Sequence, residues 1–303
     1  MAPEQDFDPP TGVAVPLGAM LRRVLAPNPS PMTFRGTNTY LLGRRGIAVI
    51  DPGPDDTAHL EAILAALQPG QRVSHVIVTH AHLDHAPLAR RLARETGAPV
   101  LARGEAQAGR SAVMQTLAKG GCVAGGEGVD TEFTPDISLA DGERIKGDGW
   151  TLTALWTPGH FCNHIALEYE DAIFTGDLVM GWASSLVSPP DGDLTDFMAS
   201  CRRLRAHDVS VFHPGHGAPV TSPADRLDWL IAHRQSREAS ILHALRAGPA
   251  SAQTLAGAIY TDTPPALLPA ATRNVLAHLI DLTVREKAAP LDRLSATARF
   301  ERL

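Results

Sequence analysis

The chain has few cysteines, and no two of them are spaced as C-x-x-C. Cys122, Cys162 and Cys201 are its 3 cysteines in 303 residues, and they lie far apart. A disulfide framework would need pairs of cysteines, so none is expected here. We therefore expect a protein of a reducing compartment, the cytoplasm.

Long apolar stretches and positive charge are also scarce. No run of about 18 apolar residues occurs, so no segment is expected to span a bilayer and no membrane partner is predicted. The acidic, proline-rich residues 1–10 lack the basic and apolar regions of a secretory signal. The net charge is −6, aromatic residues make up 5%, and Lys119, Lys146 and Lys287 are the lysines. This balance does not by itself favour a nucleic-acid partner or an anionic membrane surface.

The sequence does contain regular alternation of short β-type runs and helical stretches over its first two thirds. Helices are predicted at Thr57–Leu67 and Pro87–Glu95, whereas the glycine-rich segment 120–128 is predicted to be a loop. The predicted strands are aliphatic runs, many of them bounded by glycine or proline: Asn38–Leu42, Ile47–Asp51, Val73–Val78, Ala98–Leu101, Thr151–Thr157, Ile165–Tyr169, Ala172–Thr175 and Val209–Phe212.

The pattern becomes purely helical after Thr221. Ser222-Pro223 is typical of a helix start, with serine as the N-cap and proline at the first helical position. The helical pattern continues to Arg246, and further helices are predicted at Ala252–Ile259 and Pro269–Leu282. Three helices and a short tail that can form a hairpin indicate a winged-helix-like unit. We therefore predict two domains, residues 1–221 and 222–303.

The segment Thr79-His-Ala-His-Leu-Asp-His85 is typical of a metal site. His80, His82, Asp84 and His85 lie within six residues, directly after a predicted strand. Imidazole and carboxylate groups are the ligands that zinc takes when thiolates are absent. His80 and His82 point the same way in an extended segment, because one residue separates them. Asp84 and His85 follow where the chain begins to turn, so they can face a second ion.

Three further strand ends supply the ligands that one segment cannot. His160 ends Thr157-Pro-Gly-His160, Asp177 ends Thr175-Gly-Asp177, and His216 ends His213-Pro-Gly-His216. Loops at strand ends are where a rigid sheet holds catalytic groups. We predict two groups of ligands: His80, His82 and His160 on one ion, and Asp84, His85 and His216 on the other, with Asp177 between them.

This ligand set predicts a hydrolase with two Zn²⁺ ions per chain, although Mn or Fe can also bind such ligands. Two ions about 3.5–4 Å apart can hold a bridging hydroxide, lower its pKa to about 7 and polarise the bond to be cleaved. The nucleophile is then water, and no serine or cysteine attack is needed. Asp84 is predicted to be catalytic, because it can orient that water and pass a proton to the leaving group.

Other interpretations of the same residues are open. A closed structural zinc site would use only four ligands, usually with cysteine among them. Asp51 and Thr79 can hold the His80 loop through hydrogen bonds to the ligands, although Asp51 can equally be a simple turn cap. His213 is either such a hydrogen-bond partner or exposed. Six further histidines are predicted to be surface or packing residues: His75, His164, His207, His233, His243 and His278.

The four ligand segments, taken in this order, resemble the motifs of the metallo-β-lactamase superfamily. This resemblance implies an α/β fold, the αββα sandwich, with the site at one edge of two sheets. Arg35-Gly-Thr-Asn-Thr-Tyr-Leu-Leu-Gly43 and the helical tail near His233-Arg234 resemble the β-lactamase-like protein 2 group, in which a small winged-helix-like domain follows the hydrolase domain. The resemblance extends from about Pro27 to Lys287.

The resemblance leaves the substrate open between single-stranded RNA and a small acyl compound. Eukaryotic members of the group are endoribonucleases, so phosphodiester cleavage of single-stranded RNA is the first prediction. Related fungal proteins are thioesterases, so hydrolysis of a thioester, ester or lactam, including weak β-lactamase activity, is the alternative. A third possibility is a non-catalytic module that binds nucleic acid or a partner. The oligomeric state is not predicted.

Two sets of residues are predicted to contact the substrate. Ser184, Ser185 and Ser188 follow Asp177 closely and are expected to line the substrate groove. Arg234, Arg237 and Arg273 are expected to form a local phosphate clamp if the substrate is RNA.

Overall fold

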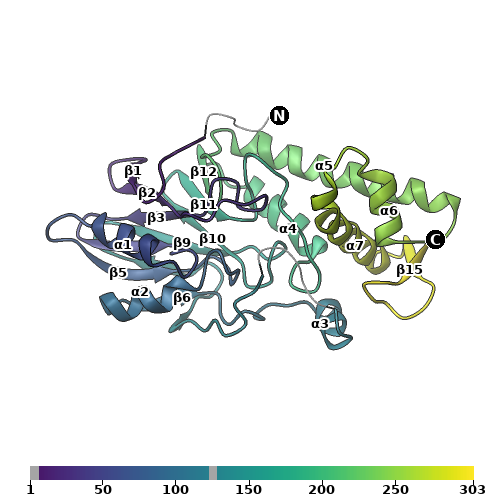
Figure 1. The fold of residues 1–303 in the computed structure, drawn as a ribbon, viewed down its shortest axis with the longest axis horizontal. Helices are drawn as coiled ribbons and strands as arrows, with labels where there is room; N and C mark the ends of the chain where they lie inside the picture. Colours follow the sequence, from purple (N-terminus) through teal and green to yellow (C-terminus); the bar gives the residue numbers. More distant parts are fainter. Residues whose placement is uncertain (1–6, 123–127) are drawn as a thin grey trace.

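Two β-sheets face each other in the computed structural model, which describes residues 7–122 and 128–303 (Figure 1). The first sheet has 7 strands, in the order β1 (Ala14–Pro16), β2 (Leu21–Leu25), β3 (Asn38–Leu42), β4 (Gly46–Ile50), β5 (Arg72–Ile77), β6 (Val100–Ala102) and β7 (Ile137–Ser138). The second has 5 strands, in the order β12 (Val211–Pro214), β11 (Ala172–Gly176), β10 (Ile165–Tyr169), β9 (Thr151–Trp156) and β8 (Arg144–Lys146).

The side chains of each strand alternate between two cores, because successive side chains of a strand point to opposite faces of the sheet. In β4, Ala48 and Ile50 belong to the core between the sheets, whereas Ile47 and Val49 pack on the outer face of the first sheet. Phe174 of β11 fills the same central core from the second sheet. All four β4 residues are buried, which explains why this strand is a continuous aliphatic run.

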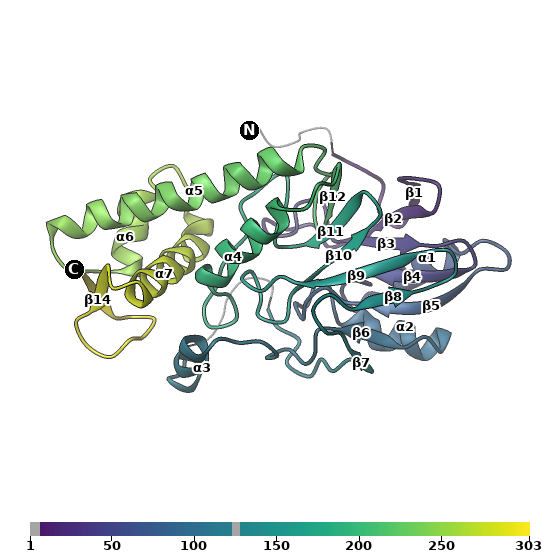
Figure 2. The same ribbon diagram turned by 180° about the vertical axis from the view of Figure 1, so that it is seen from behind.

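Helices cover both outer faces. The helices α1 (Thr57–Ala65) and α2 (Leu88–Thr96) pack on the first sheet, and α4 (Leu194–Arg205) and α5 (Pro223–Ala244) pack on the second. The layers are therefore helix, sheet, sheet and helix, as Figure 2 also shows from behind. The predicted αββα sandwich is confirmed.

The C-terminal part has a core of its own. Besides α5, its elements are η1 (Leu245–Ala247), β13 (Ala250–Ser251), α6 (Ala252–Ile259), η2 (Pro265–Leu267), α7 (Leu268–Val284), β14 (Ala288–Pro290) and β15 (Arg299–Arg302). Leu255, Leu279 and Phe300 are buried at its centre. The small sheet has the order β13-β15-β14, and this sheet with the helices beside it makes the winged-helix arrangement that the sequence predicts. Across the parts of the chain that the structure describes, no helix is long and apolar enough to cross a bilayer.

The helices α3 (Ala112–Lys119) and α4 are absent from the sequence prediction. Both carry a helical signal: Ser111 caps α3, and the buried α4 residues Leu194, Phe197, Cys201 and Leu204 follow one another at intervals of three and four. Met114 and Leu117 of α3 pack in the core of the C-terminal part. Most of the predicted glycine-rich loop, residues 123–127, lies outside the described residues.

Neighbouring strands end at one edge of the sandwich, and this edge carries the polar residues of the four motifs. The strands β4 and β5 run parallel, as do β11 and β12, so their carboxyl ends deliver Asp51, Thr79, Asp177 and Gly215 to the same place. Gly159, in the loop after β9, packs directly on α4, where a Cβ would lie 2.2 Å from the Cα of Phe197. Only glycine allows this contact, and Gly159 thereby fixes the position of the next residue, His160.

Candidate metal centre

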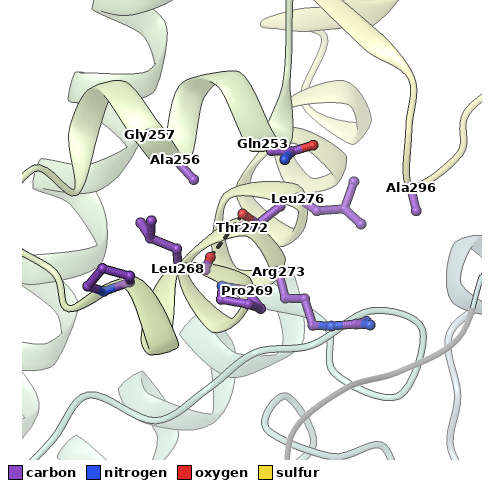
Figure 3. Close-up of a pocket in the computed structure, with 10 residues that line it drawn as sticks. Gln253, Ala256, Gly257, Leu268, Pro269, Thr272, Arg273, Leu276 and Ala296 are labelled. Atoms are coloured by element: carbon purple, nitrogen blue, oxygen red, sulfur yellow. Dashed lines mark hydrogen bonds between the residues drawn. The ribbon is translucent and has the colours of Figure 1, made fainter.

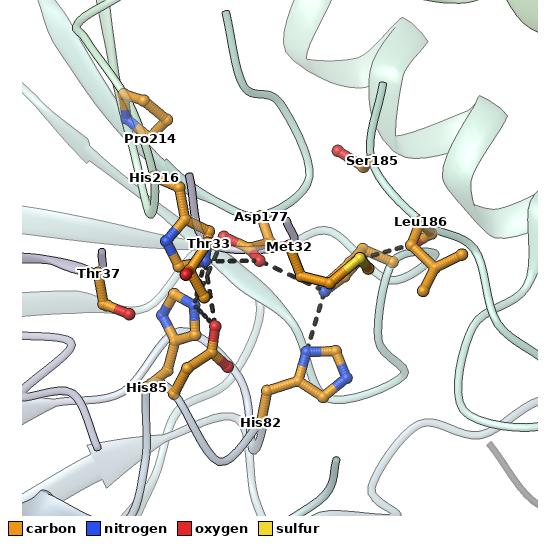
Figure 4. Close-up of polar contacts among 12 residues, drawn as sticks. Met32, Thr33, Thr37, His82, His85, Asp177, Ser185, Leu186, Pro214 and His216 are labelled. Atoms are coloured by element: carbon orange, nitrogen blue, oxygen red, sulfur yellow. Dashed lines mark hydrogen bonds and ion pairs between the residues drawn. The ribbon is translucent and has the colours of Figure 1, made fainter. Parts of the chain in front are cut away.

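Seven polar side chains from four strand ends converge on one buried cluster. Figure 4 shows four of them, His82, His85, Asp177 and His216. The side chains of His80, His82, His160 and Asp177 form one group, and those of Asp84, His85, Asp177 and His216 form the other. In each group one nitrogen or oxygen atom per residue lies within 4.8 Å of the others. Asp177 belongs to both groups. The structure thus brings together all of the predicted ligands, in the predicted grouping.

In the first group, ring nitrogens approach one another closely. His82 Nδ1 lies 3.0 Å from His80 Nε2 and 3.1 Å from His160 Nε2. Zinc–nitrogen bonds of 2.0–2.1 Å in a tetrahedron place ligand atoms about 3.3 Å apart. The three nitrogens therefore fit one small cation between them.

The second group has similar spacing. His216 Nε2 lies 3.2 Å from His85 Nε2, 3.1 Å from Asp84 Oδ2 and 3.3 Å from Asp177 Oδ2. Asp177 Oδ1 lies 3.5 Å from His85 Nε2. Two imidazoles and two carboxylates at these distances also suit one divalent cation.

Hydrogen bonds fix the tautomer of four of the histidines. The Nδ1 atoms donate to oxygen atoms: His80 to Thr79 Oγ1 at 2.9 Å, His85 to Asp51 Oδ2 at 2.9 Å, His160 to the Leu186 carbonyl at 2.7 Å and His216 to the Gly36 carbonyl at 3.1 Å. Because Nδ1 carries the proton in each case, Nε2 is left free to bind a metal. All four Nε2 atoms point into the cluster.

Asp51 links the two groups through hydrogen bonds to Thr79, which holds His80, and to His85. Its Oδ1 accepts the Thr79 backbone N–H at 2.7 Å, and its Oδ2 accepts the Thr79 hydroxyl at 2.8 Å as well as the His85 N–H. Asp51 and Thr79 therefore hold His80 and His85, two of the predicted ligands, through hydrogen bonds. The described contacts of His213 are instead with the rings of Tyr40 and Phe174.

The cluster attracts positive charge. Burial alone would lower the pKa of His216, but the carboxylates of Asp177 and Asp84 raise it to about 10. Burial would raise the pKa of Asp177, but His216 and His85 hold it well below its usual range. Among the described residues, Asp84 Oδ1 and Asp177 Oδ1 are buried and have no hydrogen-bond partner. Buried anionic oxygens without partners are costly, and a cation would satisfy them.

Two further features concern the His82 imidazole and the residue that precedes His216. Burial, followed by the neighbouring His160, lowers the pKa of His82 to about 3, so this imidazole is in the neutral form that binds metals. A Cβ on Gly215 would lie 2.3 Å from Asp177 Oδ1, which explains why glycine precedes His216. The donor set and its spacing thus fit a pair of divalent cations.

A cavity of about 240 Å³ lies between the sandwich and the C-terminal part, and it reaches the surroundings of the cluster at Leu186, whose carbonyl binds His160. Met32, Leu186, Trp182 and Tyr260 are among its walls, and Figure 4 shows Met32 beside Leu186 at the cluster. Ser184 also lines it. The other two serines predicted for the groove do not line this cavity: Ser185 donates to the Leu178 carbonyl at 2.9 Å, and Ser188 lies beside Arg273.

A larger cavity, of about 630 Å³, lies between α6 and α7 in the C-terminal part (Figure 3). Ala256, Leu268, Thr272 and Arg273 are among its walls. Its lining includes no histidine, cysteine or carboxylate. It therefore offers no acid–base or metal chemistry, and the chemical site is the cluster in the sandwich.

The predicted phosphate clamp is wrong for Arg234. This side chain is only 2% exposed, and it donates to the Ser185 carbonyl and to Asn274 Oδ1. A guanidinium that binds the chain's own oxygens inside the protein cannot face a phosphate in solvent. The signal was present in the sequence, because Leu227, Leu230 and Arg234 lie on one helical face.

The comparisons with known proteins agree with this architecture. Residues 32–216 match the family model described as metallo-beta-lactamase superfamily, and residues 251–293 match that of the beta-lactamase associated winged helix domain. The first match covers more than half of the chain. The chain belongs to the metallo-β-lactamase superfamily, and it is a hydrolase of that superfamily with a C-terminal winged-helix domain. Membership implies binding of divalent metal ions.

Two curated relatives are similar to this chain over most of its length. The beta-lactamase-like protein 2 homolog of Drosophila melanogaster is 30% identical over 278 residues, 86% of this chain and 86% of that protein. An atrochrysone carboxyl ACP thioesterase of Aspergillus fumigatus is 32% identical over 231 residues, 74% of this chain. The chain spans only 64% of the length of that fungal protein.

A solved structure shares the whole fold. The beta-lactamase domain protein from Burkholderia ambifaria has a TM-score of 0.81 and 23% identity, covering 100% of this chain and 97% of that one. At this identity, the likeness supports the fold alone. It extends through the winged-helix domain as well as the sandwich.

Proposed function

We propose that the chain is a dinuclear zinc-dependent hydrolase that cleaves acyl bonds, those of thioesters or esters. The observation that carries the proposal is the pair of ligand groups that share Asp177, with an uncharged cavity beside them. His80, His82 and His160 would hold one cation, Asp84, His85 and His216 the other, and Asp177 both. We also propose that residues 1–221 form the catalytic domain and 222–303 the winged-helix domain. A cytoplasmic location stays a prediction from the cysteine content.

The residues of the site have distinct tasks in this reaction. When bound, a pair of divalent cations supplies an acidified water molecule as nucleophile and a Lewis acid for the scissile bond. The hydrogen bonds to Thr79, Asp51, Leu186 and Gly36 keep four imidazoles in the ligating tautomer. Asp84 Oδ1, which no described donor reaches, can accept a proton and return it to the leaving group.

Replacing Asp84 with asparagine is expected to lower kcat by at least about 100-fold at saturating zinc, because proton transfer by a positioned side chain contributes 10²–10⁴-fold. The amide keeps the size of the side chain but cannot hold the proton. The measurement is steady-state turnover of a thioester by the zinc-loaded variant. The exposed Asp148 provides the control, Asp148→Asn. Unchanged turnover in Asp84→Asn would remove the proposed role.

The walls of the 240 Å³ cavity favour an acyl substrate over a nucleic acid. They include no charged side chain; apart from Ser184, Thr263 and Asn274, they consist of aliphatic, aromatic, methionine and proline residues. Cavities of this kind bind apolar groups through burial of surface, with a few polar groups for orientation. A phosphodiester backbone needs cationic side chains along its path. The thioesterase named among the relatives supports the same substrate class.

Cleavage of single-stranded RNA is the second candidate. Trp182 and Tyr260 line the cavity, and bases can stack on such rings. The relatives named beta-lactamase-like protein 2 homolog extend over most of the chain, which keeps this prediction open.

The test is a substrate profile of the zinc-loaded protein against acyl thioesters, aryl esters, nitrocefin and single-stranded RNA. We expect thioester or ester hydrolysis with little dependence on salt, and no RNA cleavage. Cleavage of RNA without turnover of any acyl substrate would overturn the acyl proposal. In that case the affinity for RNA should fall steeply with salt, because bound counterions are released.

Filling the cavity should change the choice of acyl group. Ala270 lies on α7 in the cavity wall, so Ala270→Phe removes space for two or three carbons of a substrate. Each buried CH₂ contributes about 0.8 kcal/mol, so two or three of them contribute about 1.6–2.4 kcal/mol, and we expect KM for octanoyl or naphthoyl thioesters to rise about 15- to 60-fold. The value for an acetyl thioester should change less than about twofold.

The neighbouring Ala266 is exposed and lies outside this lining, so Ala266→Phe is the matched control. An equal change in KM for short and long acyl groups in Ala270→Phe would show that the acyl group does not enter this cavity.

A further inference from the structure

The loop that follows Asp177 fixes one of the ligands through its backbone. The Leu186 carbonyl accepts the Nδ1 proton of His160 at 2.7 Å, and Leu186 is only 9% exposed. Its side chain also lines the cavity beside the cluster. The direction in which His160 Nε2 points therefore depends on where the backbone of residues 185–187 lies.

The C-terminal part holds this loop on both sides of Leu186. Arg234 of α5 donates to the Ser185 carbonyl, and Asn274 of α7 accepts the Val187 N–H at 3.0 Å. Arg234 also donates to the same Asn274 Oδ1 at 3.0 Å, which ties the two residues together. Both of these bonds to the loop use its backbone atoms, so these contacts set the course of the chain.

A second arginine of α5 supports the start of the same loop. Arg226 is 3% exposed and donates to the carbonyls of Met180 and Ala183, each at 2.6 Å. The loop from residue 180 to residue 187 is thus attached to α5 and α7 at four backbone positions. Bonds from a charged donor are among the strong hydrogen bonds in proteins.

Arg234 has no acidic partner within the described part of the chain. Its charge is balanced by the two oxygen acceptors and by the ring of Phe197, whose centroid lies 5.0 Å from the guanidinium carbon. A buried charge is expensive unless its hydrogen bonds are made. The two terminal nitrogens of Arg234 each bond one of these oxygens, whereas its buried Nε has no described partner. Movement of the loop away from Arg234 would remove one of the two bonds.

We propose that Arg234 and Asn274 are positioning residues for His160, so that the winged-helix domain sets the affinity of the first cation site. The inference rests on the proposed metal function, but not on the substrate. It makes the C-terminal domain a part of the metal centre although it contributes no ligand. It also predicts that the two cation sites respond differently: His85 and His216 are held by Asp51 and Gly36, which do not touch this loop.

The test is zinc titration of the full chain against a competing chelator. In Arg234→Met and Asn274→Leu we expect zinc affinity to fall about 10-fold at the first site and less than about threefold at the second, because replacing outer partners of a metal ligand typically costs 10–100-fold. Asn274→Asp keeps the acceptor for Val187 and should retain wild-type affinity. The exposed Arg246 gives the matched control, Arg246→Met.

A spectroscopic signature identifies the affected ligand. In the cobalt-substituted protein, the Nδ1 proton of His160 gives a paramagnetically shifted NMR signal, and its exchange with solvent should quicken in Asn274→Leu but not in Asn274→Asp. The same signals from His85 and His216 should not change. A merely structural role would weaken both sites or neither.

The inference is overturned if folded Asn274→Leu binds zinc at the first site as the wild type does, or if both sites weaken equally. If Arg234→Met does not fold, the comparison of Asn274→Leu with Asn274→Asp still tests the inference. Failure of the substrate proposal is seen separately, as a wild-type protein that binds two zinc ions but hydrolyses no acyl compound.

Discussion

Replacing Asp177 with asparagine is expected to lower kcat/KM by more than about 100-fold, because losing even a hydrogen-bond partner of a metal ligand typically costs 10–100-fold. Asp177 is the one residue that belongs to both ligand groups. An amide has one oxygen acceptor where the carboxylate has two, and it carries no charge to offset two dications. The measurements are steady-state kinetics and metal content, which should fall from two zinc ions per chain to one or fewer.

Asp208 is exposed and lies in the loop between α4 and β12, so Asp208→Asn is a matched control that should behave as the wild type. If Asp177→Asn retained two zinc ions per chain and full activity, Asp177 would not bridge the two sites, and the proposed arrangement would be wrong.

Replacing Asp51 with asparagine is expected to reduce zinc affinity at the second site about 10–100-fold. Asp51 Oδ2 accepts from both the Thr79 hydroxyl and His85 Nδ1. If the amide keeps its oxygen towards the Thr79 N–H, its NH₂ group takes the Oδ2 place and faces two donors. His85 then moves its proton to Nε2, where it blocks the metal, just as a wrong tautomer disables a catalytic histidine.

The measurement for Asp51→Asn is a chelator competition at both sites, together with activity. The first site should keep its affinity within about threefold, because His82 and His160 do not contact Asp51 and the Thr79 hydroxyl can still accept from His80. Asp55→Asn, on the exposed loop before α1, is the control. Equal loss at both sites would indicate that Asp51 acts on the fold rather than on His85.

Residue type and spacing were sufficient to predict which side chains converge in the buried cluster. Thr79–His85, His160, Asp177 and His216 each follow a strand end. The ends of parallel neighbours lie together, as those of β4 with β5 and of β11 with β12 do, whereas β9, which precedes His160, is antiparallel to both of its neighbours. The αββα sandwich was predicted from the resemblance of the ligand motifs to the metallo-β-lactamase superfamily. The side chains of β3 and β4, which pack in two cores, agree with it. The ligand motifs can be recognised in the sequence because the side chains themselves carry the metal-binding groups.

The groups that hold His160 and His216 through hydrogen bonds could not be predicted in the same way. His160 and His216 are held by the carbonyls of Leu186 and Gly36, and every residue has a carbonyl, so the sequence gives no sign of which one is used. The bonds from Arg234 and Asn274 to the loop join residues far apart in the chain. Such contacts depend on how the two domains pack, which no local pattern specifies.

For Arg234 the sequence did contain a local signal of burial, but the usual exposure of arginine was given more weight. Arginine is usually exposed, so its charge suggested a surface role. Its position on the face of Leu227 and Leu230 indicated burial instead. The helical periodicity predicted the burial of Arg234 correctly. The apolar face of α5 packs on α4 and the second sheet, and Arg234 lies on that face.

The most direct test of the account is the metal content of the purified protein, combined with anomalous diffraction at the zinc edge. We predict two zinc ions per chain, about 3.5–4 Å apart, with Asp177 bound to both. One ion should contact His80, His82 and His160, and the other Asp84, His85 and His216. A protein that binds no metal, or that binds it away from these seven side chains, would contradict the account.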